Sequence, residues 1–198
     1  MRQKPLIITL IIAISLFFII FLVMKKNNNK PPEIDINIEE LNVFAKKIAQ
    51  IEFKVVDLTN PNDLLNINEF NELVKQVSTN YNIVYSFISD NNKPERQKHI
   101  AIYALRGLDF EGYLNFFEKC LLLYQKKQLS DNVIMTVLSP GSNWNCTIVQ
   151  NYKNKKVIRL LESNLKYMSE EMKEVFKSIL SGEMWASIED ERNWSQAQ

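Results

Sequence analysis

The chain has 198 residues, enough for one domain and a tail, and its content of 46% hydrophobic and 24% charged residues is typical of a globular protein. The net charge of +1 conceals an asymmetry. Five of the 24 basic residues and no acidic residue lie within residues 1–30, so 19 basic and 23 acidic residues remain from Pro31 onward, a net of −4. An acidic body is not a basic platform for nucleic acid, so we expect no nucleic-acid partner.

The most distinctive segment covers residues 5–24, which carry no charge and only two polar side chains. As a helix, the 19 residues after Pro5 would span roughly 28 Å, about the hydrocarbon thickness of a bilayer. A cleaved signal peptide is the alternative. Such peptides have a shorter apolar core and a small-residue cleavage site, whereas this core runs directly into Lys25 and Lys26. We therefore predict an uncleaved, single-pass membrane anchor within residues 1–24.

Basic residues flank this segment on both sides, so the positive-inside count does not decide its orientation. Exporting a four-residue tail with three positive charges is harder than exporting a domain. We therefore expect the domain to lie outside the cytoplasm, in the periplasm or the extracellular space, with the membrane contacted through residues 5–24.

Residues 25–36 form a polar, proline-containing linker, and residues 37–192 read as a helical domain followed by a frayed tail at 193–198. Asn37 with Glu40 three residues later predicts a capped helix start. Asp109 and Ser169 are placed to cap later helices, and Gly182 suits a left-handed helix end. This first helix ends within residues 52–58, a stretch that can also be read as a strand. Apolar residues then recur at helical spacing in segments 68–88, 94–108, 110–124, 133–138, 144–152, 154–168, 169–181 and 184–188.

The sequence therefore predicts an all-α fold of about eight helices after the anchor. Only 4 glycines occur, too few for the turns of a sheet-rich fold. Helices that begin near Asn68, Phe110 and Asn154 lie about 42 to 44 residues apart, each followed by a second helix. In this period and grouping the chain resembles HEAT-like helical repeats. A short HEAT-like α-α stack and an irregular helical bundle both remain open, and the resemblance implies a binding surface rather than an activity.

Cys120 and Cys146 are the only cysteines. They could form one disulfide, worth about 3 kcal/mol in the chain-entropy model, or remain two buried thiols. Two cysteines and one histidine without a C-x-x-C pair do not suit zinc, and no phosphate-binding or nucleophile motif is present. We expect no metal, no cofactor and no enzymatic activity. The alternative is an envelope hydrolase or thiol enzyme that lacks a familiar motif, with Cys146 and His99 as its thiol and base.

The lone histidine, His99, precedes an apolar run. On a helical wheel it lies opposite the apolar stripe, on a polar or second-contact face shared with Glu95, Tyr103 and Arg106. We therefore expect a surface residue rather than a catalytic one. The apolar stripe consists of Ile100, Ala101, Ala104, Leu105 and Leu108. The residues that we select as candidates for partner binding are large aromatic or basic side chains: Trp144, Tyr152, Tyr103 and Arg106.

The function that these observations favour is a membrane-anchored helical module of the cell envelope that binds another protein. An inhibitor or immunity-type protein, held at the membrane to meet a toxic enzyme or pore-former, is one specific form that fits a small, acidic, anchored domain.

Overall fold

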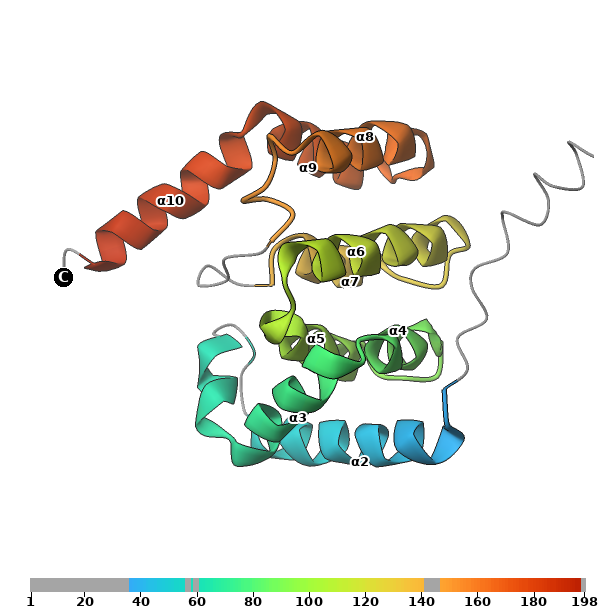
Figure 1. The fold of residues 1–198 in the computed structure, drawn as a ribbon. Coiled ribbons are helices and arrows are strands. Elements are labelled where there is room, and N and C mark those ends of the chain that lie inside the picture. Colours follow the sequence, from blue (N-terminus) through green and yellow to red (C-terminus); the bar gives the residue numbers. More distant parts are fainter. Residues whose placement is uncertain (1–35, 56–57, 59–60, 141–146, 197–198) are drawn as a thin grey trace, which may run out of the picture. The chain divides into compact units, whose positions relative to one another are not determined.

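The computed structural model describes residues 36–198 except 56–57, 59–60, 141–146 and 197–198 (Figure 1). The described residues contain nine α-helices, three short 3₁₀ helices and no strand, which confirms the all-α prediction. No described helix has both the length and the apolar character needed to cross a membrane. The predicted anchor, residues 5–24, lies outside the described residues.

The first described helix, α2 (Ile38–Lys54), begins as the sequence predicts. The side-chain oxygen of Asn37 accepts a hydrogen bond from the backbone N–H of Glu39, at 2.9 Å. One face of α2 buries Phe44, Ile48 and Ile51. The strand interpretation of its end is wrong for the residues up to Lys54, which are helical.

The predicted helix over 68–88 is two helices, α3 (Asn68–Thr79) and α4 (Asn82–Ser89). The chain leaves the helical conformation at Asn80, which has φ −148° and ψ 79°. The hydroxyls of Ser78 and Thr79 donate to carbonyls three residues back, the local bonding by which such residues compete with helix continuation. Apolar periodicity hides the break, because both helices bury their apolar faces in the same core.

Helix α5 (Glu95–Tyr103) follows Pro94 and continues into a 3₁₀ helix, Ala104–Gly107. The predicted apolar stripe is confirmed, since Ile100, Ala101, Ala104 and Leu105 are all buried. The 3₁₀ helix packs closely on α3. A Cβ at Gly107 would lie 3.3 Å from the Cβ of Ser78, so glycine permits this approach.

The next two helices are α6 (Phe110–Gln125) and α7 (Asp131–Leu138). Asp109 caps α6 by accepting a 2.7 Å hydrogen bond from Gly112, as predicted, and Ser130 caps α7 through Val133. Helix α6 ends at Lys127, which adopts a left-handed conformation with φ 58°. The backbone N–H of Gln128 then reaches the carbonyl of Leu123 at 3.0 Å, in a Schellman arrangement.

The C-terminal part contains α8 (Lys155–Asn164), a 3₁₀ turn at Leu165–Tyr167, α9 (Glu170–Ser181) and α10 (Glu183–Gln196). The caps predicted for α9 are confirmed: Ser169 accepts from Met172, and Gly182 is left-handed with φ 83°. The short helix predicted over 144–152 is not formed in its described part, where residues 148–153 make a turn. Helix α10 runs beyond the expected start of the tail at residue 193.

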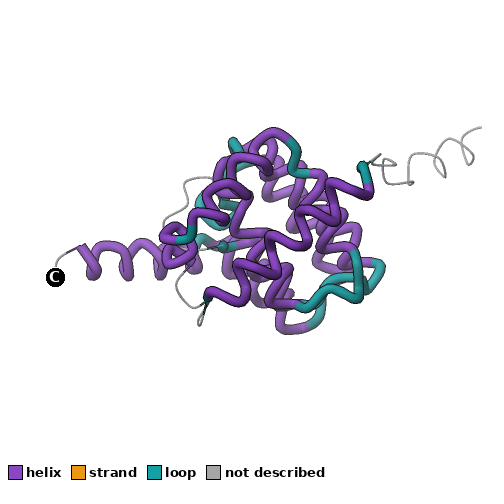
Figure 2. Tube along the Cα trace, turned by 90° about the horizontal axis from the view of Figure 1, so that it is seen from below, coloured by secondary structure: helices purple, strands orange, loops and turns teal. Residues whose placement is uncertain are grey.

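The described helices form a layered stack (Figure 1). Helix α2 packs across both α4 and α5, α4 and α5 contact α6 and α7 respectively, and α6 contacts α8. Viewed at a right angle, the loops lie at the ends of the helices and α10 projects from α9 (Figure 2). Helices begin at Asn68 (α3), Phe110 (α6) and Lys155 (α8), as the sequence predicts. The first interval, however, contains three helices, α3, α4 and α5, where a repeat of helix pairs would have two.

Aromatic and polar contacts join successive layers of this stack. The rings of Phe44 on α2 and Phe87 on α4 meet edge to face with centroids 5.4 Å apart. Tyr113, fully buried on α6, donates its hydroxyl to the carbonyl of Val137 on α7 at 2.7 Å. The core is therefore continuous from α2 to α9 rather than divided between pairs.

Candidate functional site

A hollow of about 310 Å³ lies between α6 and α8, which we call the α6–α8 hollow. Three of its residues come from α6 and three from α8: Leu114, Asn115, Glu118, Lys156, Arg159 and Leu160. On each helix the three residues are separated by one, three and four positions, so their side chains lie on the same side of that helix. Leu114 is buried and Leu160 half-buried, whereas the four polar side chains are exposed. The hollow thus combines an apolar floor with polar walls.

Two polar contacts hold α6 and α8 together on either side of this hollow. Near the start of both helices, Lys156 Nζ lies 2.6 Å from Glu111 Oε2. At the end of both helices, Gln125 Nε2 donates to Asn164 Oδ1 at 2.6 Å, and Asn164 is buried. Since start meets start and end meets end, the two helices run parallel. The walls of the hollow are therefore fixed at both ends.

The charges within the hollow are arranged by helix, with Glu118 on α6 and Lys156 and Arg159 on α8. Lys156 is paired with Glu111, but Glu118 and Arg159 form no ion pair within the described part of the chain. An exposed guanidinium can bind a carboxylate through two parallel hydrogen bonds, and a free carboxylate can accept from a lysine or arginine. The amide of Asn115 can donate and accept. This combination suits a polypeptide partner, which offers charges of both signs and backbone amides.

The surface next to the hollow, toward α4, is organised around Lys119. Its ammonium group lies 5.0 Å from the ring centre of Tyr81 and 5.7 Å from that of Tyr85, and it donates to Asn82 Oδ1 at 2.9 Å. Burial lowers the pKa of Lys119. Lys119 therefore links α6 to the start of α4 through its ammonium group.

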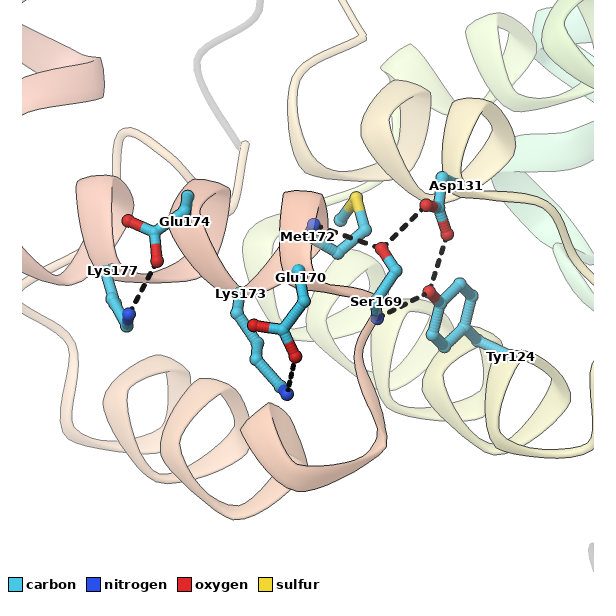
Figure 3. Close-up of polar contacts among 8 residues, drawn as sticks. All are labelled: Tyr124, Asp131, Ser169, Glu170, Met172, Lys173, Glu174 and Lys177. Atoms are coloured by element: carbon cyan, nitrogen blue, oxygen red, sulfur yellow. Dashed lines mark hydrogen bonds and ion pairs between the residues drawn. The ribbon is translucent and has the colours of Figure 1, made fainter.

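A polar cluster joins α6, α7 and α9 behind this surface (Figure 3). Asp131 accepts hydrogen bonds from the hydroxyl of Tyr124 at 2.5 Å and from that of Ser169 at 2.7 Å. The backbone N–H of Ser169 in turn donates to the Tyr124 hydroxyl at 3.3 Å, and burial raises the pKa of Tyr124. The same Ser169 hydroxyl caps α9 through Met172. This cluster fixes the α8/α9 pair on the α6/α7 pair.

The face of α5 opposite its apolar stripe lies against α7. Tyr103 is only 9% exposed and its hydroxyl hydrogen-bonds to Thr136, while burial raises its pKa. Glu95 accepts a short hydrogen bond from Ser130, the cap of α7. This is the second-contact face that the helical wheel allowed, since α5 packs between helices on two sides.

His99 lies on this same face and is half-buried. Its Nε2 atom is enclosed and has no hydrogen-bond partner among the described residues. Burial lowers the pKa of His99, and the negative charge of Glu95 works in the opposite direction. It is therefore neither the free surface residue expected from the sequence nor part of the α6–α8 hollow.

The other sequence candidates are scattered. Trp144 and Cys146 lie outside the described residues. Tyr152 is half-buried, with its ring against Gly182: a Cβ at Gly182 would lie 2.8 Å from Tyr152 Cε2. Arg106 is half-buried at the end of the 3₁₀ helix, and burial lowers its pKa. The structure does not bring the described candidates, Tyr152 and Arg106, into one site.

Cys120 is a free thiol that is completely buried, and burial raises its pKa well above the ordinary value. A thiolate, the nucleophilic form, is strongly disfavoured in such surroundings. Among the described residues no group of three or more His, Cys, Asp or Glu side chains could hold a metal ion.

Sequence reasoning missed the α6–α8 hollow. Its residues are ordinary charged and aliphatic side chains on two helices far apart in sequence, so only the pairing of α6 with α8 brings them together. Comparison with known proteins reveals no matching family model, no similar curated protein and no similar solved structure.

Proposed function

We propose that this protein is a membrane-anchored, short HEAT-like helical module of the cell envelope that binds another protein. Residues 5–24 hold it in the bilayer and residues 25–36 tether the domain on the extracytoplasmic side. The partner binds at the α6–α8 hollow. An inhibitor or immunity-type protein, held at the membrane to meet a toxic enzyme or pore-former, is one specific form that is compatible with this arrangement.

The observation that carries the proposal is the pair of unmatched charges over an apolar floor. Glu118 and Arg159 are exposed, form no ion pair in the described part of the chain, and both line the hollow. Stacked helix pairs present extended surfaces along one column of helices, and the hollow lies on such a column. Charges of both signs favour specificity and steering of a protein partner.

The test uses the full chain in its native membranes, with a photo-crosslinking residue in place of Asn115. We expect one envelope protein to be captured in stoichiometric yield. The substitution Arg159→Glu should lower this yield severalfold, because it places two like charges in the hollow. The matched control is Lys177→Glu on α9, an equal change of charge at an exposed site away from the hollow. Absence of a stoichiometric adduct, or an equal loss in both variants, would contradict the proposal.

The identity of the captured protein tests the specific form. An adduct with a toxic enzyme or a pore-former is the result expected for an immunity-type protein. An adduct with a resident subunit of a membrane complex would instead assign an assembly role to the same surface.

A further inference from the structure

Most of the large apolar side chains that the described residues expose lie on one helix. Ile38 is 76% exposed, Val43 46% and Phe53 94%, and all three are on α2. At about 100° per residue, Phe53 lies opposite the buried stripe formed by Phe44, Ile48 and Ile51. The exposed Ala49 lies on the same side as Phe53, together with the exposed polar residues Asn42, Lys46 and Gln50. We call this set, Ile38, Val43, Ala49 and Phe53, the α2 outer face.

This face lies at one end of the stack. The opposite side of α2 packs on α4 and α5, so the outer face is what the stack presents beyond its first layer (Figure 1). Terminal helices of stacked arrays normally carry polar outer faces, which keep the array soluble. A phenylalanine exposed almost completely at this position departs from that rule, and exposed apolar surface of this kind marks a contact with another phase or molecule.

The position of α2 in the chain indicates what covers this face. Helix α2 begins at Ile38, only 13 residues after the apolar segment 5–24 ends. A flexible linker of this length has an end-to-end distance of roughly 20 Å, and fully extended it reaches about 45 Å. If residues 5–24 lie in a bilayer, the start of α2 stays close to the surface of that bilayer.

From these observations we infer that the α2 outer face docks on the lipid surface, with α2 parallel to the bilayer and Phe53 inserted at its interface. The inference rests on the anchor of the proposed function. The tether makes the contact intramolecular, with an effective concentration on the order of millimolar, so a few apolar side chains suffice. Lys46, exposed on the same side two turns before Phe53, can extend its ammonium group to lipid phosphates while its methylenes cover apolar surface.

The docking would also set the orientation of the domain. With α2 against the lipid, the α6–α8 hollow lies two layers further along the stack and remains accessible to a partner in the aqueous compartment.

The test uses the full chain carrying Cys146→Ser, reconstituted at one copy per lipid nanodisc of phosphatidylcholine, with and without phosphatidylglycerol. An environment-sensitive fluorophore is attached at Phe53→Cys or, as the matched control, at Glu174→Cys on α9, an exposed site. We expect the label at position 53 to emit at shorter wavelength and to be quenched severalfold more by nitroxide-labelled lipid than the label at position 174. Stronger quenching with phosphatidylglycerol would assign a contribution to Lys46.

Other outcomes overturn the inference in distinguishable ways. Equal quenching at positions 53 and 174, in protein that stays with the discs, refutes docking and leaves the anchor intact. A shift to shorter wavelength at position 53 without quenching by lipid shows that a protein segment or a second copy covers the face. Protein that does not remain with the discs refutes the anchor as well. A label at Gln50→Cys should be quenched by nitroxide-labelled lipid, and this quenching should be lost when Phe53→Ser is added. Because Phe53 is exposed, replacing it by serine leaves the core unchanged.

Discussion

At position 99 a half-buried imidazole has one ring nitrogen, Nε2, enclosed without a hydrogen-bond partner among the described residues. In a charged ring the Nε2–H would have neither water nor a hydrogen-bond partner among the described residues, and burial lowers the pKa of His99 below its ordinary value of 6.5. Since this is the only histidine in the chain, its titration is not mixed with that of another imidazole.

The expected consequence is a loss of stability in mildly acidic solution. As the pH falls below about 6.5, the unfolded chain binds a proton that the folded chain accepts only at lower pH, so the free energy of unfolding decreases. Above that pH the imidazole is neutral in both the folded and the unfolded chain, so it does not make the free energy of unfolding depend on pH. Urea unfolding between about pH 7.5 and pH 5.5 should show this decrease for the wild type, whereas His99→Gln should be nearly flat. Equal slopes for the two proteins would contradict this account.

At the scale of elements, Asp131 is the side chain through which three helices meet. It belongs to α7 and accepts from Tyr124 on α6 and from Ser169, the cap of α9 (Figure 3). Two donors therefore depend on one carboxylate, and both are partly buried. Removing that carboxylate leaves both hydroxyls with one acceptor fewer.

We expect Asp131→Ala to lower the free energy of unfolding by roughly 2 to 3 kcal/mol, because hydrogen bonds to a charged group are worth more than neutral ones. The control is Glu174→Ala, which removes a carboxylate that pairs with Lys177 at 2.6 Å on the exposed side of α9. This change should cost less than about 0.5 kcal/mol. Urea unfolding measures the free energy of unfolding of the two variants. A similar decrease in both would show that the hydrogen bonds to Asp131 do not stabilise the fold.

The helices also show which features of the fold can be predicted from the sequence alone. Caps at Asn37, Asp109, Ser169 and Gly182 were predictable, because capping depends on side chains close in sequence. The break at Asn80 was not, because the apolar period continues through it. The burial of Tyr103 was not predictable either, since it requires knowing that α7 packs on α5. Local rules thus located most helices, while the hollow and the second face of α5 follow from pairings between distant segments.

At the scale of the whole described domain, α10 is the least integrated helix. It packs chiefly on α9, and its large apolar side chains at Met184, Trp185 and Ile188 are only half-buried. We expect a chain that ends at Gly182 to lose roughly 2 to 4 kcal/mol, about half the value of three fully buried side chains, and still to unfold cooperatively.

The control for this truncation is a chain that ends at Leu165, which also lacks α9 and with it the buried Met172, Phe176 and Ile179. That chain should lose cooperative unfolding, measured by circular dichroism during heating. If the chain ending at Gly182 behaves like the shorter one, α10 is an integral part of the fold.

The two polar contacts between α6 and α8, Glu111 with Lys156 and Gln125 with Asn164, affect how the domain responds to a bound partner. Helix α8 belongs to the outermost pair, and its contacts with the rest of the stack run through α6, the Asp131 cluster and the turn that carries Tyr152. Layers that contact only their neighbours can open one at a time, from an end inward. A partner seated between α6 and α8 would join the last layer to the one before it, so that binding would slow amide exchange in α8 and α9 far beyond the residues it touches.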